Sequence, residues 1–122
     1  MNNPENQESE LRIIRNCIIG DDTQIAEFAV LIDSKIGADC KIWRFTNLYG
    51  TCINNQTVVG SFVEMQPNTQ IGARCRIQSH AFICSLVTIE HDVFVGHGAK
   101  FINDVYPPSG DESKWKPSLV KH

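Results

Sequence analysis

The fold is decided by residues 71–95, which read IGARCR IQSHAF ICSLVT IEHDVF V. Each block of six opens on isoleucine, and its fifth residue is small or β-branched. The pattern extends outward from Ile13 to Val105 as sixteen repeats, with a step of six residues except after Leu31 and Leu48, where the step is five. A repeat this short, with one large and one small inward residue, is typical of a β-solenoid in which each unit is one strand and one corner.

The inward positions of this solenoid can be assigned from the repeat. The large positions are Ile13, Ile19, Ile25, Leu31, Ile36, Ile42, Leu48, Ile53, Val59, Met65, Ile71, Ile77, Ile83, Ile89, Val95 and Phe101. The small positions, four residues later, are Cys17, Thr23, Ala29, Lys35, Cys40, Thr46, Cys52, Thr57, Val63, Thr69, Cys75, Ala81, Val87, Val93, Ala99 and Val105. Lys35 is too large and too polar for this position, so we expect Ser34 to replace it in that shortened repeat.

Three repeats close one coil, so residues 17 or 18 apart stack in adjacent coils about 4.8 Å apart. The sequence therefore predicts an all-β protein with a parallel β-helix of about five coils over residues 13–106. Residues 1–12 are expected to be a flexible leader, and residues 107–122 a C-terminal loop or extension, since they are rich in turn-forming residues.

Composition and charge argue against nucleic-acid and membrane partners. At 122 residues the chain is one domain, and its net charge of -3 with scattered basic residues gives no electrostatic footprint for nucleic acid. No apolar run is long enough to cross a bilayer, and the polar, acidic N-terminus does not resemble a signal peptide, so we expect a cytoplasmic protein without a membrane partner.

The five cysteines are interpreted as reduced thiols. Four occupy small inward positions, namely Cys17, Cys40, Cys52 and Cys75, whereas Cys84 is expected at a corner and partly exposed. No base or electropositive group lies beside Cys84 in its repeat, so a nucleophilic thiol is not favoured.

Three segments carry a resemblance to a known family. They are residues 76–84 (RIQSHAFIC), 93–98 (VFVGHG) and 101–107 (FINDVYP), and residues 41–45 (KIWRF) and 116–121 (KPSLVK) fit the same pattern. Together they resemble the hexapeptide-repeat acyltransferases, in particular the N-acetyltransferases that modify nucleotide-linked 3-amino-3-deoxy sugars for cell-surface polysaccharides such as O-antigen. The resemblance implies a left-handed β-helix and a homotrimer that binds acetyl-CoA and a sugar nucleotide in clefts between subunits.

The chain departs from the family in three places. Family members carry Glu-Gly where this chain has Ser85 and Leu86, and Arg where it has Pro108. They also continue past the Leu-Val-Lys segment with coils that help to hold CoA. An alternative interpretation is therefore a truncated or non-catalytic trimeric β-helix partner.

The stacking rule groups the polar corner residues. It places Gly98 over His80 and His97 over Ser79, so that the two histidines are diagonal neighbours. Gly96, on the other side of His97, also leaves the backbone accessible to a ligand. By the same rule, Asn103 stacks on Ser85 and Asp104 on Leu86, at a different corner. In a trimer, the histidine corner of one subunit would then be able to face the other corner of its neighbour.

Acetyl transfer from a thioester needs a proton acceptor for the amine and a donor to the oxyanion. His80 or His97 is the candidate base, and the residues expected to act in catalysis are His80, Asn103 and Asp104. Substrate binding is expected from Gln78, Ser85 and His97, and no metal site is expected. A purely structural alternative is that Asn103 and Asp104 cap the last strand before the Pro-Pro turn. His91 and His122 are interpreted as solvated surface residues.

A γ-class carbonic anhydrase, which uses the same solenoid, is set aside. Its zinc site needs two histidines five residues apart, and the residue five after His97 is Ile102.

Overall fold

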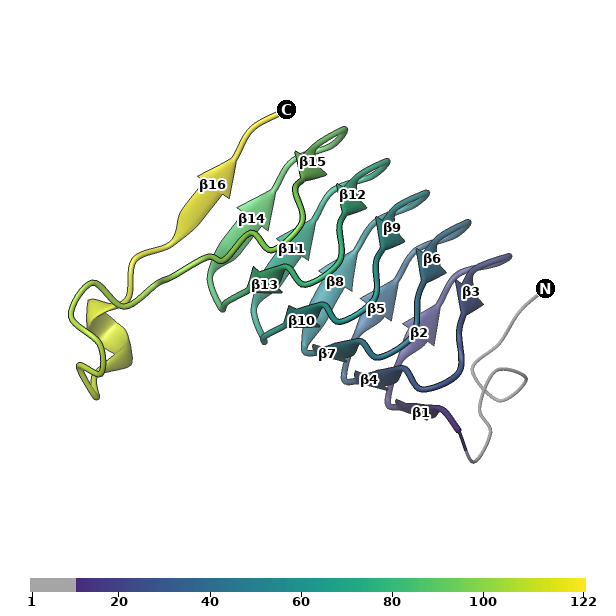
Figure 1. Ribbon diagram of the computed structural model, residues 1–122, viewed down its shortest axis with the longest axis horizontal. Helices are drawn as coiled ribbons and strands as arrows, with labels where there is room; N and C mark the ends of the chain where they lie inside the picture. Colours follow the sequence, from purple (N-terminus) through teal and green to yellow (C-terminus); the bar gives the residue numbers. More distant parts are fainter. Residues whose placement is uncertain (1–10) are drawn as a thin grey trace.

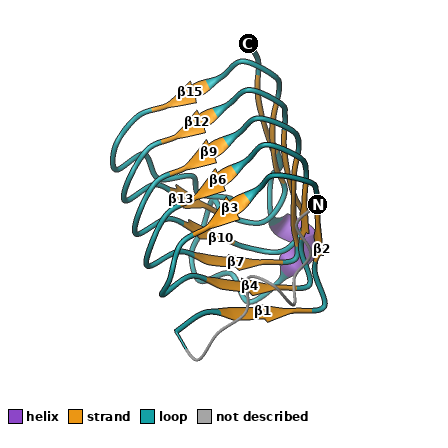
Figure 2. Cartoon of the chain, turned by 90° about the vertical axis from the view of Figure 1, so that its right-hand side faces the viewer, coloured by secondary structure: helices purple, strands orange, loops and turns teal. Residues whose placement is uncertain are grey.

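The computed structural model describes residues 11–122, which form a parallel β-solenoid of about five coils (Figures 1 and 2). The predicted all-β fold class is confirmed, since the only helical element among the described residues is η1 (Glu112–Lys114), a single turn of 3-10 helix. Most of the expected flexible leader, residues 1–10, lies outside the described residues. The left-handed coiling stays a prediction from the resemblance.

The coils build three parallel sheets, one on each side of the solenoid (Figure 2). The first sheet contains β1 (Ile13–Arg15), β4 (Val30–Ile32), β7 (Asn47–Tyr49), β10 (Glu64–Met65) and β13 (Phe82–Ile83). The second contains β2 (Ile18–Ile19), β5 (Lys35–Ile36), β8 (Thr51–Ile53), β11 (Thr69–Ile71), β14 (Val87–Ile89) and β16 (Ser118–Val120). The third contains β3 (Gln24–Ile25), β6 (Lys41–Ile42), β9 (Val58–Val59), β12 (Arg76–Ile77) and β15 (Phe94–Val95).

The register of these sheets follows the predicted stacking rule. Ile53 pairs with Ile36 on one side and with Ile71 on the other, and Ile71 pairs in turn with Ile89. Every strand therefore lies beside the strand one coil away in the sequence. Because the pairing is parallel and in register, side chains of the same repeat position form columns along the solenoid.

The large inward positions form the core, with one correction at the start of the ladder. Ile14, not Ile13, is the buried residue of the first repeat: it is 4% exposed and pairs with Leu31, whereas Ile13 is 37% exposed. The step from Ile14 to Ile19 is therefore five residues, as it is after Leu31 and after Leu48. All three short steps cross the same corner, between the first and second sheets. This corner contains one residue fewer in the first three coils.

The small inward positions also shift in the shortened repeats. Ser34 is buried and takes the place of Lys35, as predicted, and Thr51 is buried where Cys52 was expected. The Thr51 and Thr69 hydroxyls hydrogen-bond to each other, so these inward polar groups are satisfied along the column. At the last repeat the prediction fails, because Val105 is 57% exposed.

Cys84 differs from its prediction as well. It is buried at 3% exposure, and burial raises the pKa of its thiol. A raised pKa leaves less thiolate at neutral pH, which fits the interpretation of this cysteine as unreactive. The correction strengthens the structural interpretation of the cysteine.

The corners are built from residues in the left-handed backbone region. Thirteen described residues other than glycine have positive φ, among them Phe62 at +62° and His80 at +65°. This conformation costs a side chain roughly 1–2 kcal/mol, and the regular hydrogen bonding between coils stabilises it. Each corner thus presents a column of outward side chains with nearly the same backbone geometry.

The chain leaves the solenoid after β15 and returns to it. Lys100 bridges to Phe82, and the chain then runs outward through η1 and comes back as β16, which pairs with β14 from Val87↔Ser118 to Ile89↔Val120 (Figure 1). Residues 107–122 therefore add a sixth strand to the second sheet.

Candidate functional site

The six residues predicted for the site divide between two corners. The corner between the third and first sheets, here called the histidine corner, carries Gln78, His80 and His97. The corner after the first sheet, here called the asparagine corner, carries Ser85, Asn103 and Asp104. Within one chain these groups belong to different edges of the solenoid, and the structure does not bring them together.

An aromatic column runs along the histidine corner and ends in His80. Phe28 and Phe45 stack with ring centroids 5.4 Å apart, Phe45 and Phe62 with centroids 5.1 Å apart, and Phe62 and His80 with centroids 4.9 Å apart. Adjacent rings are tilted by only 8° to 13°, and the three phenylalanines are 45–53% exposed. The imidazole ring therefore packs one face against Phe62 at the end of a stacked column.

The backbone of His80 is fixed by two hydrogen bonds. Its N–H donates to the Ser61 carbonyl at 3.1 Å, and its own carbonyl accepts from Lys100 Nζ at 2.6 Å. Neither ring nitrogen has a hydrogen-bond partner among residues 11–122. A ring that is held by its face and its backbone, with both nitrogens available, is able to accept a proton from a ligand.

The space beside His80 is open because the next coil has glycine there. The Gly98 N–H donates to the Ser79 carbonyl at 3.0 Å, which aligns Gly98 with His80 as predicted. Within residues 11–122, and leaving aside the adjacent residues of the chain, a Cβ added to Gly98 or to Gly96 would meet no atom within 4 Å. His97 lies between the two glycines and is exposed. The histidine corner is thus accessible on the side of the last coil.

The asparagine corner is held by hydrogen bonds between neighbouring coils. Asn103 Nδ2 donates to the Ser85 carbonyl at 3.0 Å, which confirms the predicted stacking of these two residues. The Ser85 N–H donates in turn to Gln66 Oε1 at 3.2 Å, and Ser85 is 9% exposed. The Asn103 amide is therefore positioned by the coil beneath it.

Asp104 has a structural role at the Pro-Pro turn, in line with the capping role stated above as an alternative to catalysis. One carboxylate oxygen accepts from the Tyr106 N–H at 3.3 Å and the other accepts from the Ser109 N–H at 2.8 Å. These bonds hold the turn that contains the Pro107–Pro108 pair. Each carboxylate oxygen has a second lone pair, so a structural role leaves capacity for a ligand hydroxyl.

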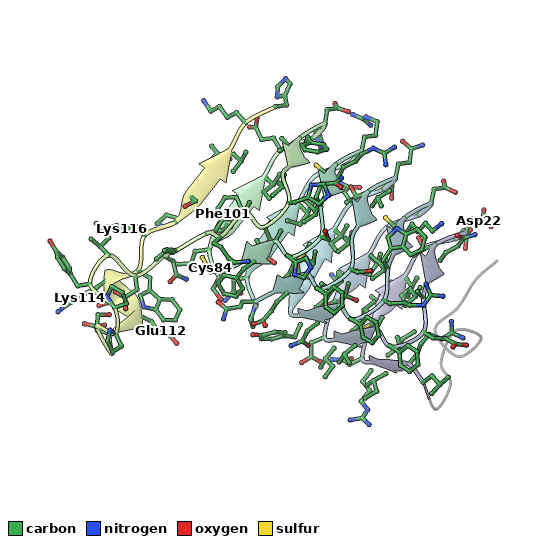
Figure 3. All side chains as sticks on the ribbon, viewed as in Figure 1. Asp22, Cys84, Phe101, Glu112, Lys114 and Lys116 are labelled. Atoms are coloured by element: carbon green, nitrogen blue, oxygen red, sulfur yellow. The ribbon has the colours of Figure 1, made fainter. Side chains whose placement is uncertain are left out.

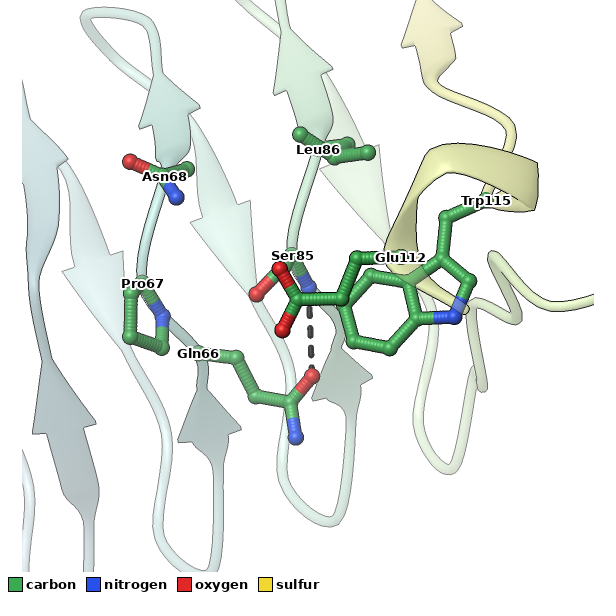
Figure 4. A pocket seen from close by; sticks show the side chains of 7 residues that line it. All are labelled: Gln66, Pro67, Asn68, Ser85, Leu86, Glu112 and Trp115. Carbon is green, nitrogen blue, oxygen red and sulfur yellow. Dashed lines mark hydrogen bonds between the residues drawn. The ribbon is translucent and has the colours of Figure 1, made fainter. Parts of the chain in front are cut away.

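A pocket of about 360 Å³ opens beside Ser85 at the asparagine corner (Figure 4). Its lining consists of Gln66, Pro67, Asn68, Ser85, Leu86, Glu112 and Trp115. The Glu112 carboxylate has no hydrogen bond or ion pair with any described residue. The pocket thus combines an aromatic ring, an amide and an unpaired carboxylate, a set that suits a polar ligand with an apolar face.

A second hollow of about 280 Å³ adjoins Asn103 and Asp104. Trp115 lines this hollow as well as the first, and the Lys116 N–H donates to the Asn103 carbonyl at 2.7 Å. The outward loop is therefore tied to the corner that carries the predicted residues. Figure 3 labels Glu112, Lys114 and Lys116 on this loop and Phe101 where the chain leaves the solenoid.

Several of these residues were missed from the sequence. The repeat does carry a signal for some of them: its spacing stacks Phe28, Phe45, Phe62 and His80 in one column and places Gln66 in register with Cys84. Glu112 and Trp115 had no such signal, because they lie in an irregular loop outside the repeat. Their place depends on how the loop returns to the solenoid.

The remaining histidines have local partners. His91 Nδ1 accepts from the Ala73 N–H at 3.1 Å, so His91 stacks over Ala73, away from His80. His122 Nδ1 lies 3.2 Å from Glu90 Oε1, and this contact lowers the pKa of the Glu90 carboxyl.

Two properties of the described part of the chain bear on ligands. No group of three histidine, cysteine, aspartate or glutamate side chains in residues 11–122 could hold a metal ion. Within the same residues there is no helix with the length and apolar character needed to span a membrane.

Comparison with known proteins found that no family model matches this chain. The chain is similar to the solved structure of AntD, an N-acyltransferase from Bacillus cereus, in complex with dTDP and 3-hydroxybutyryl-CoA. The two are 20% identical over 75% of this chain and 70% of the AntD chain, with a TM-score of 0.37. At this identity and TM-score the likeness does not bear on function.

Proposed function

We propose that this chain is an acetyl-CoA-dependent N-acetyltransferase whose acceptor is a nucleotide-linked 3-amino-3-deoxy sugar, used for cell-surface polysaccharide precursors in the cytoplasm. The observation that carries the proposal is the setting of His80. It lies in one of the three segments that carry the resemblance. Its ring nitrogens have no hydrogen-bond partner among the described residues, and they lie beside the open position at Gly98. The hydrogen-bonded Asn103 and Ser85 at the second corner supply the other polar groups.

The reaction would use these groups as follows. The neutral amine of the sugar attacks the thioester carbonyl of acetyl-CoA, and His80 accepts the proton that the amine loses. The carbon–sulfur bond breaks, and CoA leaves as the thiol after it takes up a proton. Asn103 is suited to hydrogen-bond the acyl oxygen or the sugar, and Asp104 to orient sugar hydroxyls. The close approach of the two bound substrates would supply up to about 7–11 kcal/mol of the barrier reduction in an ideal case.

A homotrimer is part of the proposal, because the two corners lie on different edges of one solenoid. The histidine corner of one copy would face the asparagine corner of its neighbour, so that each site would take His80 from one subunit and Asn103 from the other. Light scattering at micromolar concentration tests this arrangement, and a monomer would contradict it.

The activity is tested with the purified 122-residue chain, acetyl-CoA and a UDP- or dTDP-linked 3-amino-3-deoxyhexose, by following the release of CoA. We expect His80→Ala to lower turnover about 10²- to 10⁴-fold, the usual loss when a general base is removed. His91→Ala is the matched control, because His91 bonds to Ala73 at another corner, and it should leave turnover nearly unchanged. Equal losses in the two variants would indicate a folding defect and contradict the role of His80.

The alternative is a non-catalytic trimeric β-helix partner. It is favoured by Ser85 and Leu86, which stand where the family that the chain resembles carries Glu-Gly. Calorimetric titration with acetyl-CoA separates the two functions. Absence of binding, together with absence of turnover in the wild type, would support the partner and exclude the enzyme.

A further inference from the structure

The aromatic column at the histidine corner has a regular spacing that stops at His80. Its four rings follow one another at 4.9 to 5.4 Å, and the coils that carry them follow one another at the strand spacing of the solenoid. The next coil has Gly98 in the same position, with φ of +73° where Phe62 has +62°. The backbone thus provides a fifth position in the column, and the sequence leaves it without a side chain.

This fifth position is open to a ligand. Apart from the neighbours of Gly98 in the sequence, no described residue has an atom within 4 Å of a Cβ built on Gly98. The face of His80 that points away from Phe62 is therefore not covered by a side chain at this position. The His80 ring nitrogens are unpaired within the described chain, and Lys100 Nζ is held at the His80 carbonyl, 2.6 Å away. A flat group placed here would meet an aromatic face, a free imidazole edge and a nearby cation.

We infer that the sugar ring of the acceptor binds in this fifth position and stacks on His80. This inference rests on the proposed function and assigns a place to one part of the substrate. A pyranose has a face of C–H groups whose weakly positive hydrogens suit the negative face of an aromatic ring. Its 3-amino group projects from the edge of the ring, and in a stacked geometry it lies beside the free nitrogens of His80.

The chemistry favours the sugar over the nucleobase of the same substrate. A nucleobase stacked on His80 would hold the sugar amine one nucleoside diphosphate away, out of reach of the imidazole that is proposed to accept its proton. With the sugar ring in this position, the face of His80 stacks on the sugar and a nitrogen at the edge of the same ring accepts the amine proton.

The test fills the fifth position with a side chain that the corner already accepts. Phenylalanine occurs at this repeat position three times, with φ of 60° to 66°, so Gly98→Phe should fold and extend the column. We expect the KM for the nucleotide-linked amino sugar to rise at least about tenfold, because the stack is lost and the space is blocked. The Kd for acetyl-CoA and the Kd for UDP or dTDP alone should not change, and the melting temperature should be equal or higher.

Gln56→Phe is the matched control. It adds an exposed phenylalanine at a corner residue with φ of +60°, on the edge between the second and third sheets. It should leave all four quantities unchanged. An unchanged KM in Gly98→Phe would overturn the inference. So would an equal loss of affinity for UDP or dTDP alone, since that result would place the nucleobase on His80.

A second pair of variants separates stacking from proton transfer. His80→Phe keeps an aromatic face and removes the base, so kcat should fall about 10²- to 10⁴-fold while the KM for the amino sugar stays within about threefold. His80→Ala should raise that KM as well. Equal KM values in the two variants would contradict the stacking role.

Binding measurements keep this inference distinct from the proposed function. If the wild type binds the nucleotide-linked amino sugar without transferring acetyl, and Gly98→Phe weakens that binding, the proposed activity fails and the stacking site stands. If the wild type acetylates the sugar and Gly98→Phe behaves as wild type, only the stacking site fails. If the wild type neither binds nor acetylates it, both are overturned.

Discussion

Two corners of the solenoid share one backbone conformation and differ in their side chains. The histidine corner presents Phe28, Phe45, Phe62 and His80 at positive φ, and then Gly98. The corner between the second and third sheets, here called the charged corner, presents Asp22, Asp39, Gln56, Arg74 and Asp92 at positive φ. The comparison shows that the coil fixes the backbone at a corner without choosing the side chain that it carries.

The polar and charged side chains of the charged corner are those expected at an exposed position. Arg74 Nε and Nη2 donate to the two carboxylate oxygens of Asp92 at 2.8 and 3.2 Å, in the last two coils of that column. The histidine corner instead exposes about half of each phenylalanine and ends with an open position. Both columns have the same positive-φ backbone, so the backbone alone does not require aromatic residues at the histidine corner. The stacking site offers a functional reason for them.

The largest expected effect comes from a substitution in the hydrophobic core, on which both corners depend. Leu48 is fully buried in the middle of the solenoid, and Leu48→Ala should lower the free energy of unfolding by about 2–5 kcal/mol. Asn47→Ala, at the exposed neighbouring position, should change it by less than about 0.5 kcal/mol. Urea unfolding followed by circular dichroism at one fixed protein concentration measures both, because assembly makes stability depend on concentration. Similar values for the two variants would contradict the assigned core.

A smaller effect separates the two corners. Phe45 stacks on two rings, and Phe45→Ala should lower the free energy of unfolding by about 1–3 kcal/mol, the sum of two aromatic pairs. Gln56→Ala at the charged corner, in the neighbouring column of the solenoid, should cost less than about 0.5 kcal/mol. The same unfolding measurement applies. If the two costs were equal, the aromatic column would contribute nothing to stability beyond ordinary surface residues.

The smallest effect concerns the ion pair of the charged corner. Hydrogen bonds from Arg74 hold the pKa of Asp92 below its ordinary value, so Asp92 contributes stability above its unfolded pKa and loses it as the pH falls through its folded pKa. Asp92→Asn should therefore lower the urea midpoint slightly at pH 7, with a difference that shrinks below about pH 4 and in high salt. A difference that grew on acidification would have the wrong sign for this pair.

The pitch of the solenoid was predictable from the sequence because it is a local property. Repeats of six residues place one strand and one corner each, and the stacking rule then gave the pairing of Ile53 with Ile71 and the stacking of Asn103 on Ser85. The errors at Ile13 and Cys52 have a common cause. A five-residue repeat has one residue fewer at its corner. The small inward residue is therefore found by counting back two residues from the next large inward residue. That count gives Ser34 and Thr51.

What the sequence by itself determined is the coil, its columns of stacked residues and the glycine that ends the aromatic column. The tertiary structure alone decided where the outward loop lies. Glu112 and Trp115 reach the pocket beside Ser85 because Asp104 holds the Pro-Pro turn, the Lys116 N–H bonds to Asn103, and β16 pairs with β14. A repeat places its residues by short-range geometry, whereas this loop has no repeat. Its path is set by a few long-range hydrogen bonds that no spacing in the sequence records.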